Sequence, residues 1–279
     1  SLFFFFRYER KGTKEITLVL EYLPGGDLFS LLLARKTFSM EMTRFYTACA
    51  YFALIHMHSR NILCRDLKLE NMAIARDGNL KLIDLGLAKC STKKCYTVCG
   101  SPEIISPEMI SNTGYYTQVD FWALGVLVHE MAVGRAPFGD RNSYSSVHRS
   151  VLQYSRRRRA MKRKVTEFDA VQQLLPWLAD SKQGYTTASF VYRLLHPQPS
   201  LRLGCTSRRK IDFEGHMFFQ SPSWNWKSFA IGKQKIPYVP KLDSAFDMTY
   251  FDKSTNNEDD FAMLNHAMRD DESDCCVVS

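Results

Sequence analysis

The chain has 279 residues, of which 45% are hydrophobic and 24% charged, and its formal net charge is +8. This apolar content is ample for a packed core, which excludes a natively disordered chain, and the length suits one large domain or two small ones. We expect no membrane-spanning segment and no secretory leader, because no long apolar run and no cleavage-like segment occur in the sequence.

A buried strand is predicted at residues 3–6, and the elements that follow are a second strand, a turn and two helices. Residues 16–22 form a β-branched and aromatic run that ends at the turn residues 24–26, Pro-Gly-Gly. Asp27 follows directly and can cap a helix that begins at Leu28. Apolar residues recur at helical spacing from 39 to 58, which predicts a long buried helix.

A β-hairpin is predicted next. The turn sequence Asp-Gly-Asn at 77–79 lies between two strand-like segments, 71–75 and 80–84. Since the outer ends of a hairpin's two strands lie together, we expect Asn71 and Asp84 on the same side of its open end.

The rest of the chain is predicted to be mostly helical and to end in a tail. Residues 120–131 are strongly apolar and indicate a central helix. Mixed, mostly helical elements continue to about residue 219. Beyond residue 221, two prolines and the acidic, polar stretch 256–260 predict an extended tail laid over the domain surface, not a second core.

Four side chains form the most informative chemical pattern. The segment Cys-Arg-Asp-Leu-Lys-Leu-Glu-Asn supplies Asp66, Lys68 and Asn71, and the segment Ile-Asp-Leu-Gly supplies Asp84. Phosphoryl transfer from a nucleotide needs a carboxylate that accepts a hydroxyl proton, a cation beside the transferred group and oxygen ligands for Mg²⁺. We expect Asp66 to be the base, Lys68 to be the cation, and Asn71 and Asp84 to be the metal ligands.

These two segments resemble the catalytic loop H-R-D-L-x-x-x-N and the metal-binding D-F-G motif of protein kinases. Other segments resemble further kinase motifs in the same order: the hinge at Glu21-Tyr22-Leu23, C-G-T-P-E at Cys99-Gly-Ser-Pro-Glu, A-P-E at Ser106-Pro-Glu108, D-x-W-x-x-G from Asp120, and the arginine segment Leu201-Arg-Leu-Gly204. The resemblance implies structural roles for Asp120 and for a pair formed by Glu108 and Arg202.

Within the family the details resemble the AGC group, and in particular its cAMP-dependent branch. The segment Gly-Gly-Asp-Leu-Phe-Ser from residue 25 and the tail segment 237–241 agree with that branch. In that branch an aromatic residue of the tail crosses the nucleotide pocket, and Phe246 or Tyr250 could do so here. Packing of these aromatic residues on the small lobe is the alternative.

The resemblance implies an α+β, protein-kinase-like fold in three parts. Residues 1–22 would be remnant small-lobe strands, residues 23–219 a mostly helical large lobe, and residues 220–279 an AGC-type C-terminal tail. A basic segment near 154–165 departs from the family pattern, and we expect it to be an insertion on the large lobe.

The implied function is that of a serine/threonine protein kinase that uses ATP and Mg²⁺ on basic protein substrates, with a regulatory subunit or inhibitor as a further partner. The expected nucleotide-binding residues are Glu21, Leu23, Asp27, Glu70, Asn71, Asp84 and Phe246. Asp27, Glu70 and Glu130 would receive the substrate's arginines. Phosphorylation of Thr97 would pair it with Arg65 and order the activation segment.

Departures from the family pattern leave a second function open. No G-x-G-x-x-G and no V-A-I-K lysine precede the hinge, so we expect a truncated gene model, an isoform or a fragment that lacks most of the small lobe. The alternative to an active enzyme is an impaired kinase or pseudokinase that acts as a binding scaffold. Leu85 replaces the Phe of D-F-G, and Cys64 stands where the family has His or Tyr.

The cysteines, the basic run and the C-terminus bear on location and partners. The eight cysteines fit no common zinc spacing, so we expect free thiols in a reducing compartment, the cytoplasm or the nucleus. The run 156–164 is typical of a nuclear-localisation or nucleic-acid patch, or of a solvated surface with no partner. It contains no aromatic residues, so no specific nucleic acid is expected. Residues 276–279 have the C-a-a-X form, and we expect membrane attachment only if Cys276 is prenylated, which the neighbouring acidic residues disfavour.

Overall fold

A computed structural model describes residues 6–9, 16–139, 143–161, 165–179, 184–206, 208–244, 247 and 249–250, with side chains described from residue 20 onward. The predictions for Phe246 and Cys276 lie outside these ranges. Among the residues that the structure describes, no helix combines the length and the apolar character that crossing a bilayer requires.

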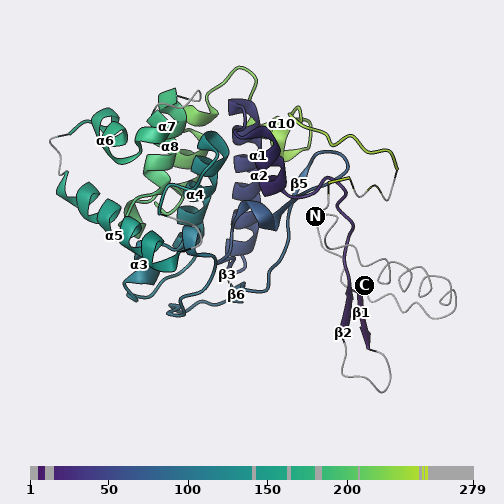
Figure 1. Ribbon diagram of the computed structural model, residues 1–279, viewed down its shortest axis with the longest axis horizontal. Coiled ribbons are helices and arrows are strands. Elements are labelled where there is room, and N and C mark those ends of the chain that lie inside the picture. Colours follow the sequence, from purple (N-terminus) through teal and green to yellow (C-terminus); the bar gives the residue numbers. More distant parts are fainter. Residues whose placement is uncertain are drawn as a thin grey trace.

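Three helices form the centre of the molecule (Figure 1). They are α2 (Met40–His58), α4 (Gln118–Val133) and α8 (Gly184–Leu194). The helix α4 packs against both others and is buried on all of its faces, which explains why its sequence is apolar without helical periodicity. The predictions of a long buried helix and of a central apolar helix are therefore confirmed.

Shorter helices surround this centre. They are α1 (Leu28–Arg35), α3 (Pro107–Ile110), α5 (Tyr144–Ala160), α6 (Glu167–Leu174), α7 (Pro176–Ala179), α9 (Arg209–Glu214) and α10 (Trp226–Ala230). The α1 helix begins as predicted, because the carboxylate of Asp27 accepts the backbone N–H of Ser30 at 2.8 Å. Four 3₁₀ turns are described as well: η1 (Leu69–Asn71), η2 (Pro102–Ile104), η3 (Pro199–Leu201) and η4 (Met217–Phe219).

The described strands form three two-stranded antiparallel sheets. They pair β1 (Phe6–Glu9) with β2 (Ile16–Val19), β3 (Ile62–Leu63) with β6 (Lys89–Cys90), and β4 (Met72–Ile74) with β5 (Leu80–Leu82). The β4–β5 pair is the predicted hairpin, with Met72 opposite Leu82 and Ile74 opposite Leu80. The β1–β2 hairpin lies apart from the helical body (Figure 1).

The beginning of the tail differs from the extended chain that we predicted. Residues 226–230 form the helix α10, which Asn225 caps by accepting the N–H of Ser228. Its aromatic side chains pack on α2, where Trp226 stacks on Phe52 at a centroid distance of 5.9 Å. The pattern failed here because the apolar face of so short a helix becomes evident only against its partner.

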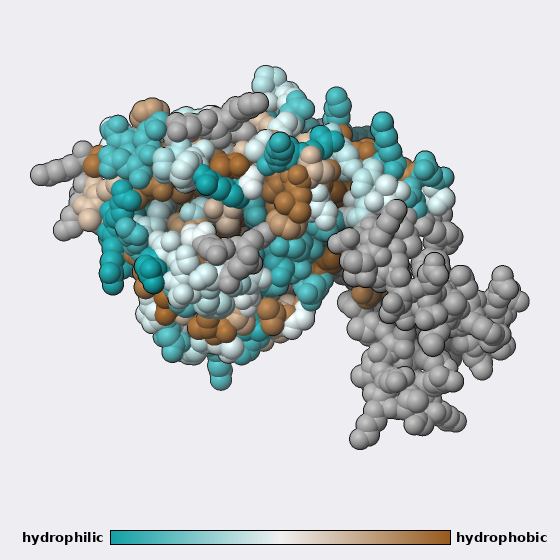
Figure 2. All heavy atoms as spheres, in the orientation of Figure 1, coloured by the Kyte–Doolittle hydropathy of each residue, from teal (hydrophilic) through white to brown (hydrophobic). Residues whose placement is uncertain are grey.

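The described part of the basic run is helical and partly packed on the body of the protein. Residues 156–160 continue α5, and strongly hydrophilic side chains gather where this helix lies (Figure 2). Arg158 turns inward and donates to the carbonyl oxygens of Tyr192 and of Leu195, the latter at 3.0 Å. It thereby satisfies carbonyl groups at the C-terminus of α8, which is a structural role. Arg156, Arg157 and Arg159 remain exposed.

Candidate active site

The loop that carries the predicted base is fixed to the first turn of α4. Asp120 of that turn accepts the backbone N–H groups of Cys64 and Arg65, both at 2.9 Å, and lies 2.7 Å from Nε2 of His58. Arg65 has a φ of 65°, in the left-handed region, and these hydrogen bonds hold it in that conformation. A residue of the buried central helix therefore sets the position of Asp66, which follows directly.

Both carboxylate oxygens of Asp66 are engaged, and the side chain is buried. Its Oδ1 accepts the N–H of Ser101 at 2.9 Å and the hydroxyl of Ser101 at 3.0 Å. Its Oδ2 accepts the amide nitrogen of Asn71 at 3.0 Å and lies 3.2 Å from Nζ of Lys68. The structure therefore brings Asp66, Lys68 and Asn71 together, as the sequence predicted.

Ser101 is a site residue that the sequence reasoning did not identify. Its Oγ donates to Asp66 and accepts a hydrogen bond from Nζ of Lys68 at 2.8 Å, so one hydroxyl joins the base to the cation. The available signal was its place in Cys99-Gly-Ser-Pro-Glu, where the resembling motif has a threonine hydroxyl.

The two predicted metal ligands lie at the open end of the β4–β5 hairpin. The N–H of Ile83 donates to the carbonyl of Asn71 at 2.8 Å, which brings the following Asp84 beside Asn71. The amide nitrogen of Asn71 donates to Asp66, so its amide oxygen points away from that carboxylate. Asp84 is exposed. An amide oxygen and an exposed carboxylate are the hard ligands that Mg²⁺ prefers, so these residues fit the ion.

A buried ion pair links the segment that contains Ser101 to the central helix α4. Arg202 donates from Nη1 and Nη2 to the two carboxylate oxygens of Glu108, at 2.8 and 3.0 Å. Nη1 also donates to the carbonyl of Gln118, where α4 begins, at 2.7 Å. The pair implied by the resemblance is therefore present, and it ties the segment that contains Ser101 and Glu108 to the central helix.

The last described residues of the tail, 247 and 250, lie against the segment before α1. The hydroxyl of Tyr22 donates to the carbonyl of Asp247 at 2.6 Å. A Cβ added to Gly26 would lie 2.9 Å from the carbonyl oxygen of Tyr250, so these two backbones nearly touch. The tail therefore reaches the expected hinge at Asp247, one residue after the predicted Phe246.

The family model of the protein kinase domain matches residues 4–213. The chain belongs to the protein kinase family. A cAMP-dependent protein kinase catalytic subunit-like protein of Caenorhabditis elegans is 31% identical over 251 residues, 90% of this chain and 55% of that protein. The human cAMP-dependent protein kinase catalytic subunit PRKX is 33% identical over 245 residues, 88% of this chain and 62% of that protein. The cGMP-dependent protein kinase egl-4 of Caenorhabditis briggsae is 33% identical over 254 residues, 89% of this chain and 31% of that protein.

These relatives make the protein an AGC-like kinase with a kinase fold, as predicted. The chain spans about half the length of the first of the curated relatives that it matches.

The segment 21–23, which we predicted to be the hinge, precedes α1. The carboxylate of Glu21 forms an ion pair with Lys81 of β5, and Leu23 is buried. The side chain of Glu21 is thus engaged with the large lobe, so any contact that this residue makes to a nucleotide would come from its backbone.

The three acidic residues predicted to bind substrate arginines differ in their surroundings. Both oxygens of Asp27 accept hydrogen bonds from Ser30, so this carboxylate stabilises the start of α1. Glu70 is partly buried in η1, which contacts α1. Glu130 is buried in α4.

The hydroxyl of Tyr115 bridges the side chain of Arg65 and the backbone of Thr97. The hydroxyl of Tyr115 donates to the carbonyl of Thr97 at 2.6 Å, and Nη1 of Arg65 donates to the same hydroxyl at 3.4 Å. Arg65 also donates from Nε to the carbonyl of Leu87 at 2.7 Å. The guanidinium therefore lies near the backbone of the predicted phosphorylation site, and Tyr115 is a second residue that the sequence reasoning missed.

Cys64 takes the place of an aromatic or polar residue beneath the metal motif. Its side chain is buried, and this burial, reinforced by the nearby Asp120, raises the pKa of the thiol. Cys64 is therefore a neutral apolar group in the core and not a reactive thiolate.

Proposed function

We propose that this kinase transfers the γ-phosphoryl group of ATP to serine or threonine hydroxyl groups of basic proteins, with Mg²⁺ as the cofactor. The observation that carries this proposal is the set of contacts around Asp66, in which Ser101, Asn71 and Lys68 hold a single buried carboxylate in place. A carboxylate with fixed oxygens has the orientation that a base needs before a hydroxyl reaches it.

Each residue then has a chemical task. Asp66 orients the acceptor hydroxyl and takes its proton as the phosphoryl group is transferred. Lys68, positioned by Ser101, stabilises negative charge on the transferred group. When bound, Mg²⁺ neutralises charge on the nucleotide phosphates, and Asn71 and Asp84 would hold it.

The preference for basic substrates is supported by the charge of three residues. Asp27, Glu70 and Glu130 lie at positions where the resemblance predicts acidic contacts to substrate arginines. Asp27 also caps α1, so its carboxylate would serve both the helix and the substrate. We also propose that phosphorylation of Thr97 adds a charged partner for Arg65 and orders the activation segment.

The test is transfer of radiolabelled phosphate from ATP to two serine peptides, one with arginines before the serine and one with glutamates there. We expect the basic peptide to be labelled, and Asp66→Asn to lower the rate by roughly 100-fold or more, the usual effect of losing a positioned base. Asp77→Asn removes an exposed carboxylate from the β4–β5 turn and should leave the rate unchanged. Equal labelling of the two peptides would contradict the substrate preference, and a rate unaffected by Asp66→Asn would contradict the mechanism.

A second candidate function is binding without transfer. Folded protein that binds the basic peptide but gives no labelling at all would support this candidate over catalysis.

A further inference from the structure

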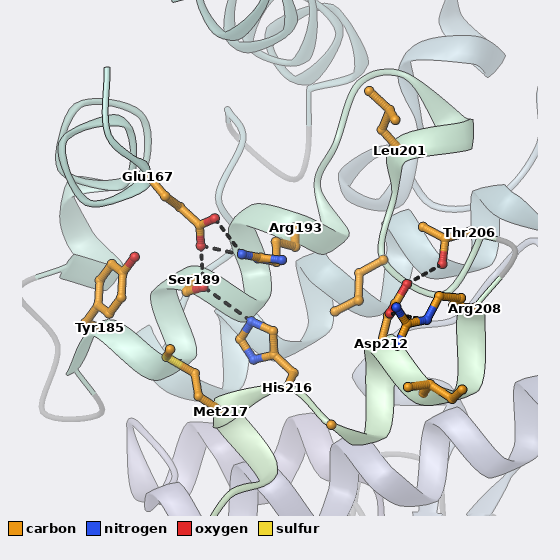
Figure 3. Close-up of a pocket in the computed structure, with 13 residues that line it drawn as sticks. Glu167, Tyr185, Ser189, Arg193, Leu201, Thr206, Arg208, Asp212, His216 and Met217 are labelled. Carbon is orange, nitrogen blue, oxygen red and sulfur yellow. Dashed lines mark hydrogen bonds and ion pairs between the residues drawn. The ribbon is translucent and has the colours of Figure 1, made fainter. Parts of the chain in front are cut away.

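A cavity of about 770 Å³ opens beside α8 (Figure 3). Its walls come from the start of α6, from one face of α8 and from residues of 201–206 and 208–217, the latter including α9. As far as the described residues go, none of those assigned above to catalysis, metal binding or substrate binding lines this cavity.

One side of the cavity carries a chain of hydrogen bonds (Figure 3). Glu167 pairs with Arg193 (Oε2 to Nη2, 3.0 Å) and accepts the hydroxyl of Ser189. Ser189 Oγ in turn lies 3.3 Å from Nε2 of His216. The array contains a serine, a histidine and a carboxylate, so a hydrolytic role has to be considered first.

The direction of the hydrogen bonds excludes that role. The N–H of Phe218 donates to Nδ1 of His216 at 3.2 Å, so Nδ1 is an acceptor and Nε2 carries the proton of the neutral ring. Burial and the nearby Arg193 lower the pKa of His216 to about 4, which keeps the ring neutral at pH 7. His216 therefore donates to Ser189 and cannot take its proton, so the array is a fixed polar wall without a nucleophile.

The rim of the cavity is apolar to an unusual degree for exposed residues. Leu201 is 56% exposed, Ile211 62% and Met217 46%, and all three line the cavity. Tyr185 adds an aromatic face beside Phe168, at a centroid distance of 5.5 Å. Large apolar side chains gathered around a concave site indicate a surface that is covered by another molecule.

The charge that this cavity presents to solvent is positive. The side chains of Arg193 and Arg208 are 53% and 68% exposed, whereas those of their partners Glu167 and Asp212 are 26% and 35% exposed. Asp212 also accepts the hydroxyl of Thr206 at 2.8 Å, as Glu167 accepts that of Ser189, so the carboxylates are engaged inside the cavity. The next residues along the chain, 209 and 210, are an exposed arginine and an exposed lysine.

From this combination we propose that the cavity docks an acidic peptide segment of a partner protein that carries large apolar side chains. Carboxylates of the peptide would meet Arg193 and Arg208, and its apolar side chains would cover Leu201, Ile211 and Met217. A nucleic acid would use the positive charge and leave the aliphatic rim exposed, and a small anion would leave most of the volume unfilled, so a peptide fits the observations better than either.

The proposal is tested by selecting peptides that bind the folded chain. A library of random 12-residue peptides is displayed on phage and selected on the folded chain, and the binding of enriched peptides is then measured by fluorescence anisotropy. We expect peptides rich in Asp or Glu together with Leu, Ile, Phe or Met. This outcome differs from that for the active site, where the proposed function predicts basic peptides.

Two variants of cavity residues and two matched control variants test whether the peptide binds at the cavity. Arg208→Glu and Ile211→Ser should each weaken binding of the acidic peptide at least tenfold. Arg156→Glu on α5 and Leu33→Ser on α1 make the same changes at exposed positions outside the cavity and should leave binding unchanged. Thermal unfolding of each variant verifies that it is folded.

Three results would overturn the proposal. The first is that no acidic peptide is enriched. The second is that the enriched peptides bind the two cavity variants as tightly as the wild type, and the third is that the control variants weaken binding as much as the cavity variants. A kinase that proves inactive would leave this test intact, since the readout is binding at a site that shares no described residue with the active site.

Discussion

The buried pair between Arg202 and Glu108 leads to the strongest prediction about stability. The guanidinium of Arg202 is fully buried, donates twice to Glu108, and also donates to the carbonyls of Gln118 and His196, the latter at 3.1 Å. Arg202→Ala would leave a buried carboxylate without its cation and both carbonyls without these donors. Removal of one partner from a buried pair typically lowers the free energy of unfolding by about 3–5 kcal/mol.

Chemical unfolding in urea, followed by circular dichroism, measures this loss of free energy. Thermal unfolding gives a second readout. For a chain of this size each kcal/mol corresponds to about 2–4 °C in the melting temperature, so we expect Arg202→Ala to melt roughly 6–20 °C below the wild type. Arg208→Ala is the matched control, because Arg208 and Asp212 form an exposed pair with an N–O distance of 3.8 Å. Such exposed pairs contribute about 1 kcal/mol or less.

A double-mutant cycle isolates the interaction itself. The double variant Glu108→Gln, Arg202→Ala should lose less free energy of unfolding than the two single variants added together, by roughly 1–3 kcal/mol, because the second change no longer strands a buried charge. A loss below about 1 kcal/mol for Arg202→Ala, or strict additivity in the cycle, would refute the reasoning.

Three further predictions concern the site and the core. Ser101→Ala should lower the rate of peptide phosphorylation by roughly 10- to 100-fold, because a hydrogen bond to the charged Asp66 contributes about 1.5–3 kcal/mol. Ser101→Thr keeps the hydroxyl group and should retain the rate. Equal rates for the two variants would contradict the positioning role. Gly204→Ala should destabilise the fold by roughly 2–4 kcal/mol in urea, since φ is 87° and the new Cβ would lie 2.3 Å from the ring of Phe121; an unchanged midpoint would be the contrary result. Burial lowers the pKa of His129 from 6.5 to about 4, so the folded state binds this proton less readily than the unfolded state and stability falls as the pH drops below 6.5. Protonation of His129 should lower the free energy of unfolding by about 3 kcal/mol between pH 7 and pH 4. His129→Gln should not show this part of the loss. Parallel pH profiles of urea stability for the variant and the wild type would show that His129 does not contribute.

The parts of the fold that were predictable depend on residues close in sequence. The cap at Asp27 and the turn that begins at Asp77 each need only three or four neighbouring residues, and the structure has both. The predicted base, cation and amide also meet, because one loop carries all three. The link between Glu108 and Arg202 spans a long stretch of chain, and only the resemblance to a family revealed it.

The features that were missed arise from contacts between distant segments. Ser101 reaches Asp66 across 35 positions and Arg158 reaches Leu195 across 37, and no local pattern encodes such distances. A run of arginines predicts an exposed surface, and the sequence does not show that one of these side chains is turned inward. The cavity beside α8 was unpredictable for the same reason, because its walls come from three separated parts of the chain.

The hydrogen bonds of Asp120 have a consequence for amide hydrogen exchange. The amide hydrogens of Cys64 and Arg65 are held by a carboxylate of a helix that is buried on all of its faces, so their release requires this loop to separate from α4. The N–H of Lys241, in contrast, donates to the exposed hydroxyl of Tyr250 and can be released by a local opening of the tail. These two amides of the loop that holds the base should therefore exchange more slowly than the amide of Lys241, although the loop forms part of a surface site.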